Sequence, residues 1–101
     1  MERLTKYTLY VGLNDKETKE QKIKTEDAMQ VVSDVVGDST MQIVHGYYTH
    51  EDGTRINETT LKVELLFKDD NSIRLYCNDI KRLLNQESIA VSKAVEMSAL
   101  I

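Results

Sequence analysis

The sequence predicts an α+β fold in which two helices cover one face of a four-stranded antiparallel sheet. Four segments, at 7–12, 41–48, 61–67 and 89–97, alternate apolar and polar residues with the period of a β-strand. Two further segments, 28–36 and 73–84, repeat apolar residues with the period of an α-helix. Their order along the chain is β-α-β-β-α-β, the order of the ferredoxin-like sandwich. We expect one such domain over residues 1–101.

The first strand and first helix have clear apolar faces. Alternation places Tyr7, Leu9 and Val11 on one face of the strand. Thr25 is the expected N-cap of the helix, and Gly37 supplies a left-handed stop at its end. The buried stripe of the helix consists of Ala28, Val31, Val32, Val35 and Val36. Because valine is a mediocre helix former, a strand over 31–36 is the main alternative.

A tight hairpin joins the two middle strands, since Asp52-Gly53 allows the positive φ that short turns require. On the third strand, Leu61, Val63, Leu65 and Phe67 are expected to face the core. The polar stretch 14–24 is expected to be a solvated loop between the first strand and the first helix.

The second helix begins after a cluster of capping residues at 69–72. Its apolar stripe consists of Ile73, Tyr76, Cys77, Ile80, Leu83 and Leu84. We expect Cys77 to be a small packed residue, because no second cysteine or basic cluster surrounds it in the sequence. In the last strand Lys93 interrupts the apolar alternation, which predicts a bulge or an exposed strand end there. The core face of that strand is expected to consist of Ile89, Val91, Val95 and Met97.

Composition excludes several classes of function. The net charge of −4 disfavours nucleic-acid binding, which relies on Lys and Arg neutralising phosphates. The charged N-terminus lacks the apolar region of a signal peptide, and no apolar stretch approaches a membrane span. We therefore expect a cytoplasmic protein that contacts neither membrane nor nucleic acid.

The face of the sheet opposite the helices is expected to be uncovered. It mixes apolar groups with charges of both signs, a composition that favours self-association into a dimer or trimer. The residues expected on this interface are Tyr10, Val44, Lys62, Glu64, Leu66, Ala94 and Glu96.

Short motifs give few chemical signals. The segment 9–12 resembles the first signature of RNA-recognition domains, but Glu64 stands where the third strand of those domains carries basic and aromatic residues. His45 and His50 are the only histidines, and with one distant cysteine they do not form a structural zinc set. A solvated hairpin tip without a metal is expected, and the alternative is an interfacial site formed by copies of His50 with carboxylates. No nucleophile elbow, P-loop or dinucleotide motif is present, and no cofactor is expected.

Two stretches are similar to the PII-like superfamily, which includes PII signalling proteins and CutA cation-tolerance proteins. The segment 40–47 resembles the second PII strand, and 62–70 resembles the third strand with its acidic entry to the second helix. The resemblance implies trimers with ligand clefts between subunits, near Gly46, Tyr47 and Tyr48. The long PII loop and the glycine-rich phosphate turn have no counterpart, so ATP binding is not implied. The segment 9–13 also looks like small uncharacterised bacterial proteins of this shape.

The leading functional hypothesis is a non-enzymatic, oligomeric module that binds a small ligand or a protein partner. Its candidate site consists of Tyr10, His45, Gly46, Tyr47, Tyr48 and His50. One alternative is a small dimeric enzyme, of the monooxygenase or isomerase type, with Tyr and His in a pocket between sheet and helices. A buried His45 beside a tyrosine would favour that enzyme. A further alternative is a structural interaction module without a small ligand.

Overall fold

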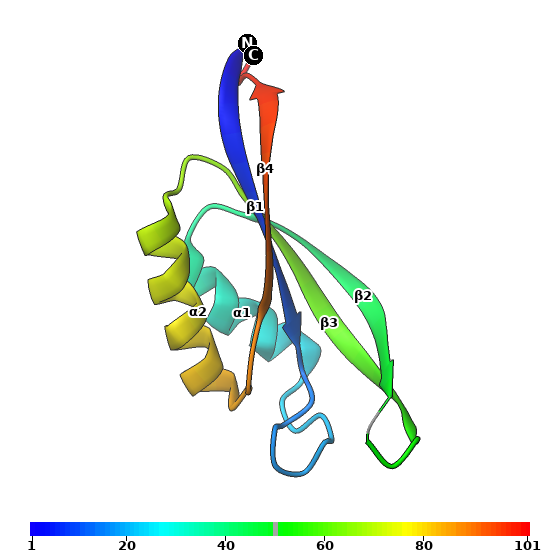
Figure 1. Cartoon of the computed structure of the whole chain (residues 1–101). Helices are drawn as coiled ribbons and strands as arrows, with labels where there is room; N and C mark the ends of the chain where they lie inside the picture. The colour runs from blue at the N-terminus through cyan, green and yellow to red at the C-terminus, as the bar shows by residue number, and fades with distance from the viewer. Residues whose placement is uncertain (50) are drawn as a thin grey trace.

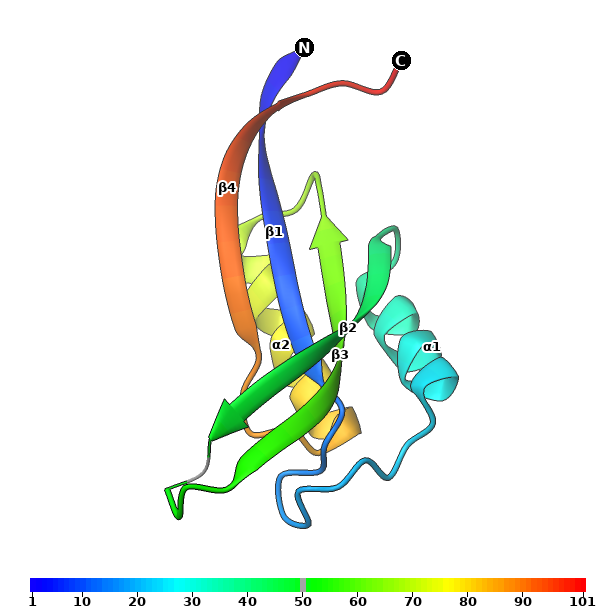
Figure 2. The same ribbon diagram turned by 90° about the vertical axis from the view of Figure 1, so that its right-hand side faces the viewer.

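The computed structural model describes residues 1–49 and 51–101 and has the predicted order of elements. In chain order the elements are β1 (Glu2–Gly12), α1 (Thr25–Val36), β2 (Thr40–Thr49), β3 (Arg55–Leu65), α2 (Asp70–Leu84) and β4 (Ala90–Ser98). The four strands form one antiparallel sheet in the order β2-β3-β1-β4. Both helices lie on the same face of this sheet (Figures 1 and 2). The fold class predicted from the sequence is therefore confirmed.

The core lies between the sheet and the two helices. Leu9 and Val11 on β1, and Leu61 and Val63 on β3, are completely buried. Burying such aliphatic side chains contributes roughly 1.5–3 kcal/mol each and is the main force holding the layers together. Cys77 packs at the edge of this core, where burial raises the pKa of its thiol.

Helix α1 is a helix despite its valines, so the strand alternative for 31–36 is wrong. Ala28, Val32 and Val36 face the core, and this burial outweighs the weak helix propensity of valine. The predicted cap is wrong, because the N-cap is Lys24 and makes no side-chain cap hydrogen bond. Gly37 ends the helix with the predicted positive φ, 73°, although its ψ of −136° lies outside the left-handed helical region.

Helix α2 is capped at both ends. The side chain of Asp69 accepts a hydrogen bond from the Ser72 amide at 2.7 Å, which also lowers the pKa of that carboxyl. Asn85 ends the helix in the left-handed conformation, with φ of 49°. After Asn85 the chain turns toward the end of β1, where the Gln86 side chain donates to the carbonyl oxygen of Asn14.

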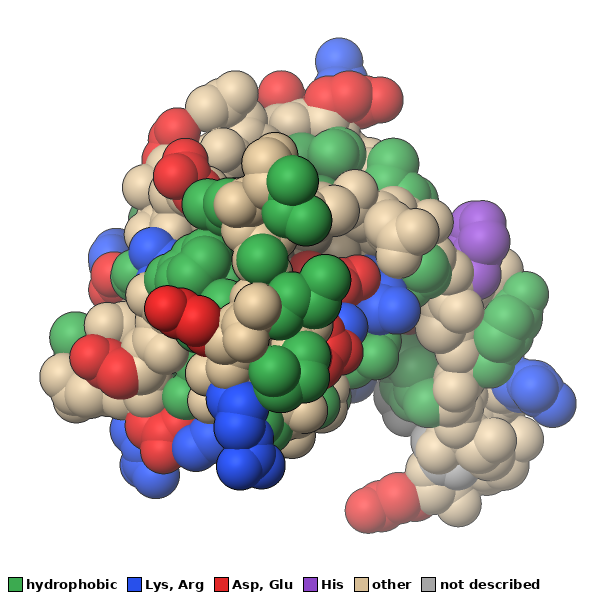
Figure 3. Space-filling view, turned by 90° about the horizontal axis from the view of Figure 1, so that it is seen from above, with side chains coloured by type: hydrophobic (Ala, Val, Ile, Leu, Met, Phe, Trp, Pro, Cys, Tyr) green, Lys and Arg blue, Asp and Glu red, His purple; other side chains and the backbone are tan. Residues whose placement is uncertain are grey.

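The strands extend beyond the helices at both ends of the molecule (Figure 1). The N-terminal part of β1 pairs with the C-terminal part of β4 at one end, and the β2–β3 hairpin projects at the other. Val95 and Met97 are therefore about 60% exposed, although their alternation predicted a core position. Viewed from the end that carries both termini, apolar side chains lie among charged ones (Figure 3).

Two local predictions for the strands concern Phe67 and Lys93, and the first of them is wrong. Phe67 follows the end of β3, has a left-handed backbone and is exposed rather than in the core. At Lys93 the second of the two predicted alternatives holds: β4 is exposed from Ala90 to Met97, and its register against β1 continues without a bulge through the Tyr7–Lys93 pair. The Lys93 ammonium lies on the helix side of the sheet, 2.9 Å from the Asp70 carboxylate at the start of α2. The Asp70 carboxylate neutralises the Lys93 charge in this position, and the strand stays regular.

Candidate functional site

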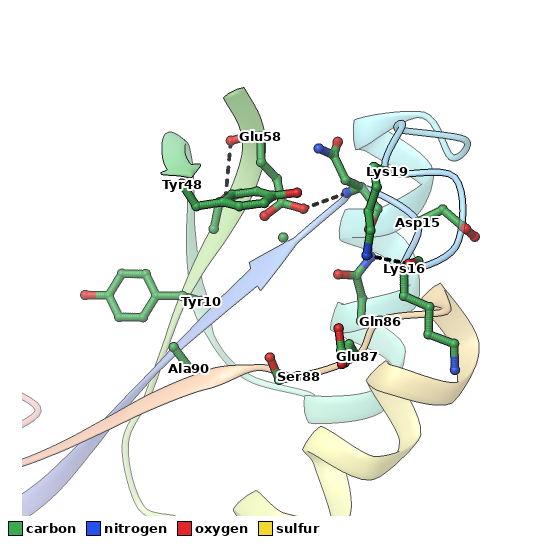
Figure 4. A pocket seen from close by; sticks show the side chains of 13 residues that line it. Tyr10, Asp15, Lys16, Lys19, Tyr48, Glu58, Gln86, Glu87, Ser88 and Ala90 are labelled. Carbon is green, nitrogen blue, oxygen red and sulfur yellow. Dashed lines mark hydrogen bonds between the residues drawn. The ribbon is translucent and has the colours of Figure 1, made fainter. Parts of the chain in front are cut away.

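A polar cleft of about 430 Å³ lies where β1 ends (Figure 4). This volume is within the range typical of small-molecule sites. Three parts of the chain form its walls: the end of β1 with the following loop, the β2–β3 hairpin, and the segment after α2. The lining residues are Tyr10, Gly12, Asn14, Asp15, Lys16, Lys19, Tyr48, Glu58, Thr60, Gln86, Glu87, Ser88 and Ala90.

Glu58 is an acidic group that is held in a defined position in the cleft. Its carboxylate accepts a hydrogen bond from the backbone amide of Asn14 at 2.9 Å. The side chain lies directly over Gly12, where the β-carbon of any other residue would overlap the carboxylate. The lack of a side chain at position 12 therefore lets the Glu58 carboxylate lie across the end of β1.

Tyr10 and Tyr48 provide the aromatic surface of the cleft. They come from β1 and β2, and more than a third of each side chain is exposed. The Tyr48 ring lies beside the Glu58 carboxylate, whereas the Tyr10 ring lies at the outer edge of the cleft (Figure 4). Two aromatic surfaces near a fixed carboxylate form a favourable setting for an organic cation.

Asp15 organises the loop that closes one side of the cleft. Its carboxylate accepts hydrogen bonds from the Asn85 side-chain amide at 2.8 Å and from the backbone amides of Glu17 and Thr18 at 2.9 and 3.1 Å. These bonds, with the Asn85 amide contributing most, lower the pKa of Asp15 to about 2. The loop is thus a fixed wall and not only a solvated connection.

The segment after α2 is attached to the same loop. The backbone amide of Lys16 donates to the Asn85 carbonyl oxygen at 3.0 Å. The buried Gln86 side chain donates to the carbonyl oxygen of Asn14 at 2.7 Å. These contacts join residues that are about seventy positions apart in the sequence. The position of Glu87 and Ser88 in the cleft therefore depends on the loop that follows β1.

The structure divides the candidate ligand-binding residues between the two faces of β2. Tyr48 lines the cleft together with Tyr10, and Gly46 lies opposite Glu58 in the strand register. His45 and Tyr47 alternate to the other side of β2 and are exposed, with the Arg55 guanidinium over the Tyr47 ring. His50 lies outside the described residues. His45 is exposed and is not buried beside a tyrosine, so the arrangement that would favour a monooxygenase or isomerase is not found.

The residues expected at the oligomer interface share the uncovered face of the sheet. Tyr10 lies opposite Lys62, and Ala94 lies opposite Lys6, in neighbouring strand pairs. The Lys6 ammonium forms ion pairs with Glu64 at 3.3 Å and with Glu96 at 3.0 Å. Leu66 comes after the end of β3, and Val44 continues the face onto β2. Whether a second chain covers this face stays a prediction.

Sequence reasoning missed Glu58, Lys19, Gln86 and Glu87. The sequence held one weak signal, for Glu58 alone, because this residue lies in the expected hairpin between the two middle strands. Among residues 1–49 and 51–101, the structure contains no group of three His, Cys, Asp or Glu side chains arranged to hold a metal ion. No helix in the described part of the chain has the length and apolar character needed to cross a membrane.

Comparison with known proteins identifies the class of fold. No protein-family model matches the sequence, and no curated protein was found to be similar to it. A phage SAM lyase in complex with S-methyl-5'-thioadenosine is similar in structure, with a TM-score of 0.71 and 17% identity over 93% of this chain and 85% of that chain.

Two further solved structures have the same fold. CutA1 from Ehrlichia chaffeensis has a TM-score of 0.56 and 15% identity, over 94% of this chain and 84% of that chain. The GlnK–ATP complex of B. subtilis has a TM-score of 0.50 and 17% identity, over 91% of this chain and 82% of that chain. The chain therefore has a PII- and CutA-like ferredoxin fold, and the resemblance seen in the sequence is confirmed at the level of structure.

Proposed function

We propose that this protein binds S-adenosylmethionine in the cleft beside Glu58 and cleaves it as a lyase, releasing S-methyl-5'-thioadenosine. The observation that carries the proposal is the fixed Glu58 carboxylate next to the Tyr48 ring. S-Adenosylmethionine carries a sulfonium cation, for which a carboxylate and aromatic faces are complementary groups. The similarity to a phage SAM lyase that holds S-methyl-5'-thioadenosine supports this choice of ligand.

The cleavage needs no water and no external base. A carboxylate oxygen of the substrate attacks its own γ-carbon while the bond from that carbon to sulfur breaks. The electron pair of the broken bond goes to sulfur, so the sulfonium becomes the neutral thioether of S-methyl-5'-thioadenosine. The remaining four-carbon unit closes to homoserine lactone, and all atoms are accounted for. The protein has to hold the substrate chain folded, since orientation alone accelerates such ring closures strongly.

This assignment suits the groups that the cleft provides. Glu58 and Glu87 carry the negative charge that a cationic substrate requires, and Tyr48 provides an apolar face for it. A carboxylate is a weak base, so internal displacement is a better match than removal of a carbon-bound proton. A substrate made inside cells also agrees with the cytoplasmic location expected from the sequence.

The test is turnover of S-adenosylmethionine by the purified protein. We expect S-methyl-5'-thioadenosine to accumulate in liquid chromatography with mass detection. Glu58→Gln should lower kcat/KM by about tenfold or more, as expected for loss of a charged contact. Glu51→Gln is the matched control, because Glu51 is exposed on the turn of the same hairpin. Intact S-adenosylmethionine after incubation with the folded wild-type protein would contradict lyase activity.

A second candidate is a non-enzymatic oligomeric module that binds an adenosyl ligand and reports it to a partner. The structural similarity to the GlnK–ATP complex favours this candidate, as do the two lysines in the cleft, which suit an anionic group. Binding of S-adenosylmethionine or ATP in calorimetry, without any product, would select this alternative over the lyase.

A further inference from the structure

The cleft contains charges of both signs in separate places. Glu58 approaches from β3 and Glu87 from the segment after α2, whereas Lys16 and Lys19 come from the loop after β1. The carboxylate of Asp15 is directed into its own loop, where it meets backbone and Asn85 donors. Two acidic and two basic side chains therefore remain available to a ligand.

Lys19 differs from Lys16 in its direction. The Lys19 side chain points into the cleft toward Gln86, across from Tyr48, whereas the Lys16 side chain points away from the tyrosines (Figure 4). The ammonium of Lys19 donates to the carbonyl oxygen of Lys16 at 2.7 Å. An ammonium has three donors, so two are left for a ligand in the described part of the structure.

The backbone holds Lys19 in this place. Its φ is 63°, in the left-handed region of backbone conformation. Its amide donates to the Asp15 carbonyl oxygen at 2.8 Å, and the Asp15 amide donates to Glu20 at 2.8 Å. Lys6 and Lys93 are neutralised by ion pairs with carboxylates, but Lys19 forms none within residues 1–49 and 51–101.

We infer that Lys19 binds the α-carboxylate of the aminobutyryl chain of S-adenosylmethionine and so selects ligands that carry this group. The inference rests on the proposed function and deepens it. The substrate has two cations, the sulfonium and the α-ammonium, and one anion, the carboxylate. Glu58 and Glu87 complement the two cations, and Lys19, across the cleft from Tyr48, complements the anion. One carboxylate oxygen is held by the ammonium, which leaves the other to attack the γ-carbon.

The experiment compares two unreactive ligands by isothermal titration calorimetry. S-Adenosylhomocysteine carries the α-carboxylate, and S-methyl-5'-thioadenosine does not. Lys19→Met should weaken binding of S-adenosylhomocysteine by about tenfold or more, the loss of one charge-assisted hydrogen bond. Binding of S-methyl-5'-thioadenosine should change less than about twofold. Lys19→Arg should retain most of the affinity, because it keeps the charge.

The control is Lys22→Met, which removes a positive charge from the same loop at an exposed residue that does not line the cleft. It should leave both affinities close to wild type. Equal losses for both ligands in Lys19→Met, or no loss for either, would overturn the role of Lys19 while leaving the cleft as the binding site. A wild-type protein that binds neither ligand would overturn the proposed function and the inference with it.

Discussion

At the scale of single residues, the site depends on close contact between Gly12 and Glu58. A β-carbon at position 12 would overlap the Glu58 carboxylate, and the flexible end of that side chain is the part that has to move. We predict that Gly12→Ala leaves the protein folded but displaces Glu58 from the Asn14 amide. S-Adenosylmethionine cleavage should then fall by about tenfold or more, measured as kcat/KM.

Gly46→Ala is the matched control for this prediction. Gly46 lies on β2 opposite Glu58, and its added carbon would be 3.2 Å from the Thr60 hydroxyl, a tight contact that a small shift relieves. The control should lose much less activity than Gly12→Ala. If Gly12→Ala is as active as wild type, Glu58 does not need its present position.

Asp15 gives the protein a defined sensitivity to acid. Its pKa in the folded protein is about 2, below the ordinary value near 4, so folding favours the charged carboxylate. The stability that Asp15 contributes is complete above about pH 4 and is lost as the pH falls toward about 2. Asp15→Asn should therefore melt at a lower temperature than wild type at neutral pH, with the difference shrinking below about pH 4. Thermal melts across this range provide the check, and a difference independent of pH would count against the prediction.

Some of the individual site residues could be predicted from the sequence. Tyr10 and Tyr48 could be singled out because alternation along a strand fixes the face of each aromatic residue. Glu58 and Gln86 could not, because their positions follow from contacts with the loop after β1 that are distant in sequence. Lys19 could not either, because its position follows from the conformation of that loop. His45 was included with the tyrosines from its proximity in sequence, but alternation places it on the other side of β2.

At the scale of elements, periodicity predicted the order of strands and helices, because burial on one face dictates the period. The valine-rich α1 shows that packing outweighs helix propensity. Strand β4 shows that an apolar alternation does not by itself mean burial. Its apolar alternation continues through Val95 and Met97, although no helix lies over them. The sequence pattern indicates which face a residue takes and does not indicate how far the covering helix extends.

Helix α2 should contribute to stability mainly through its buried face. Ile80 is fully buried between α2 and the sheet, so Ile80→Ala should lower the free energy of unfolding by about 2–5 kcal/mol. Leu75 lies on the same helix with 57% of its surface exposed. Leu75→Ala should change the free energy of unfolding by less than about 0.5 kcal/mol. Urea unfolding followed by circular dichroism measures both. Similar losses for the two variants would mean that α2 does not pack as described.

At the scale of the whole molecule, the uncovered face of the sheet leads to a prediction about assembly. It carries Tyr10, Lys62 and Ala94 together with the ion pairs of Lys6, and no element of the described chain covers it. We expect a dimer or trimer formed through this face, because such mixed surfaces are commonly interfaces. Size-exclusion chromatography with light scattering should give two or three times the chain mass of 11.6 kDa. A mass equal to one chain at micromolar concentration would refute this prediction.

The central claim is that the cleft beside Glu58 is the site for an adenosyl ligand, and titration of ¹⁵N-labelled protein with S-methyl-5'-thioadenosine tests it most directly. The account predicts that NMR shift changes concentrate at the backbone amides of Gly12, Asn14, Glu58 and Ser88, which line the cleft. Changes confined to the groove between α2 and β4, around Cys77 and Ile89, or no changes at all, would contradict it.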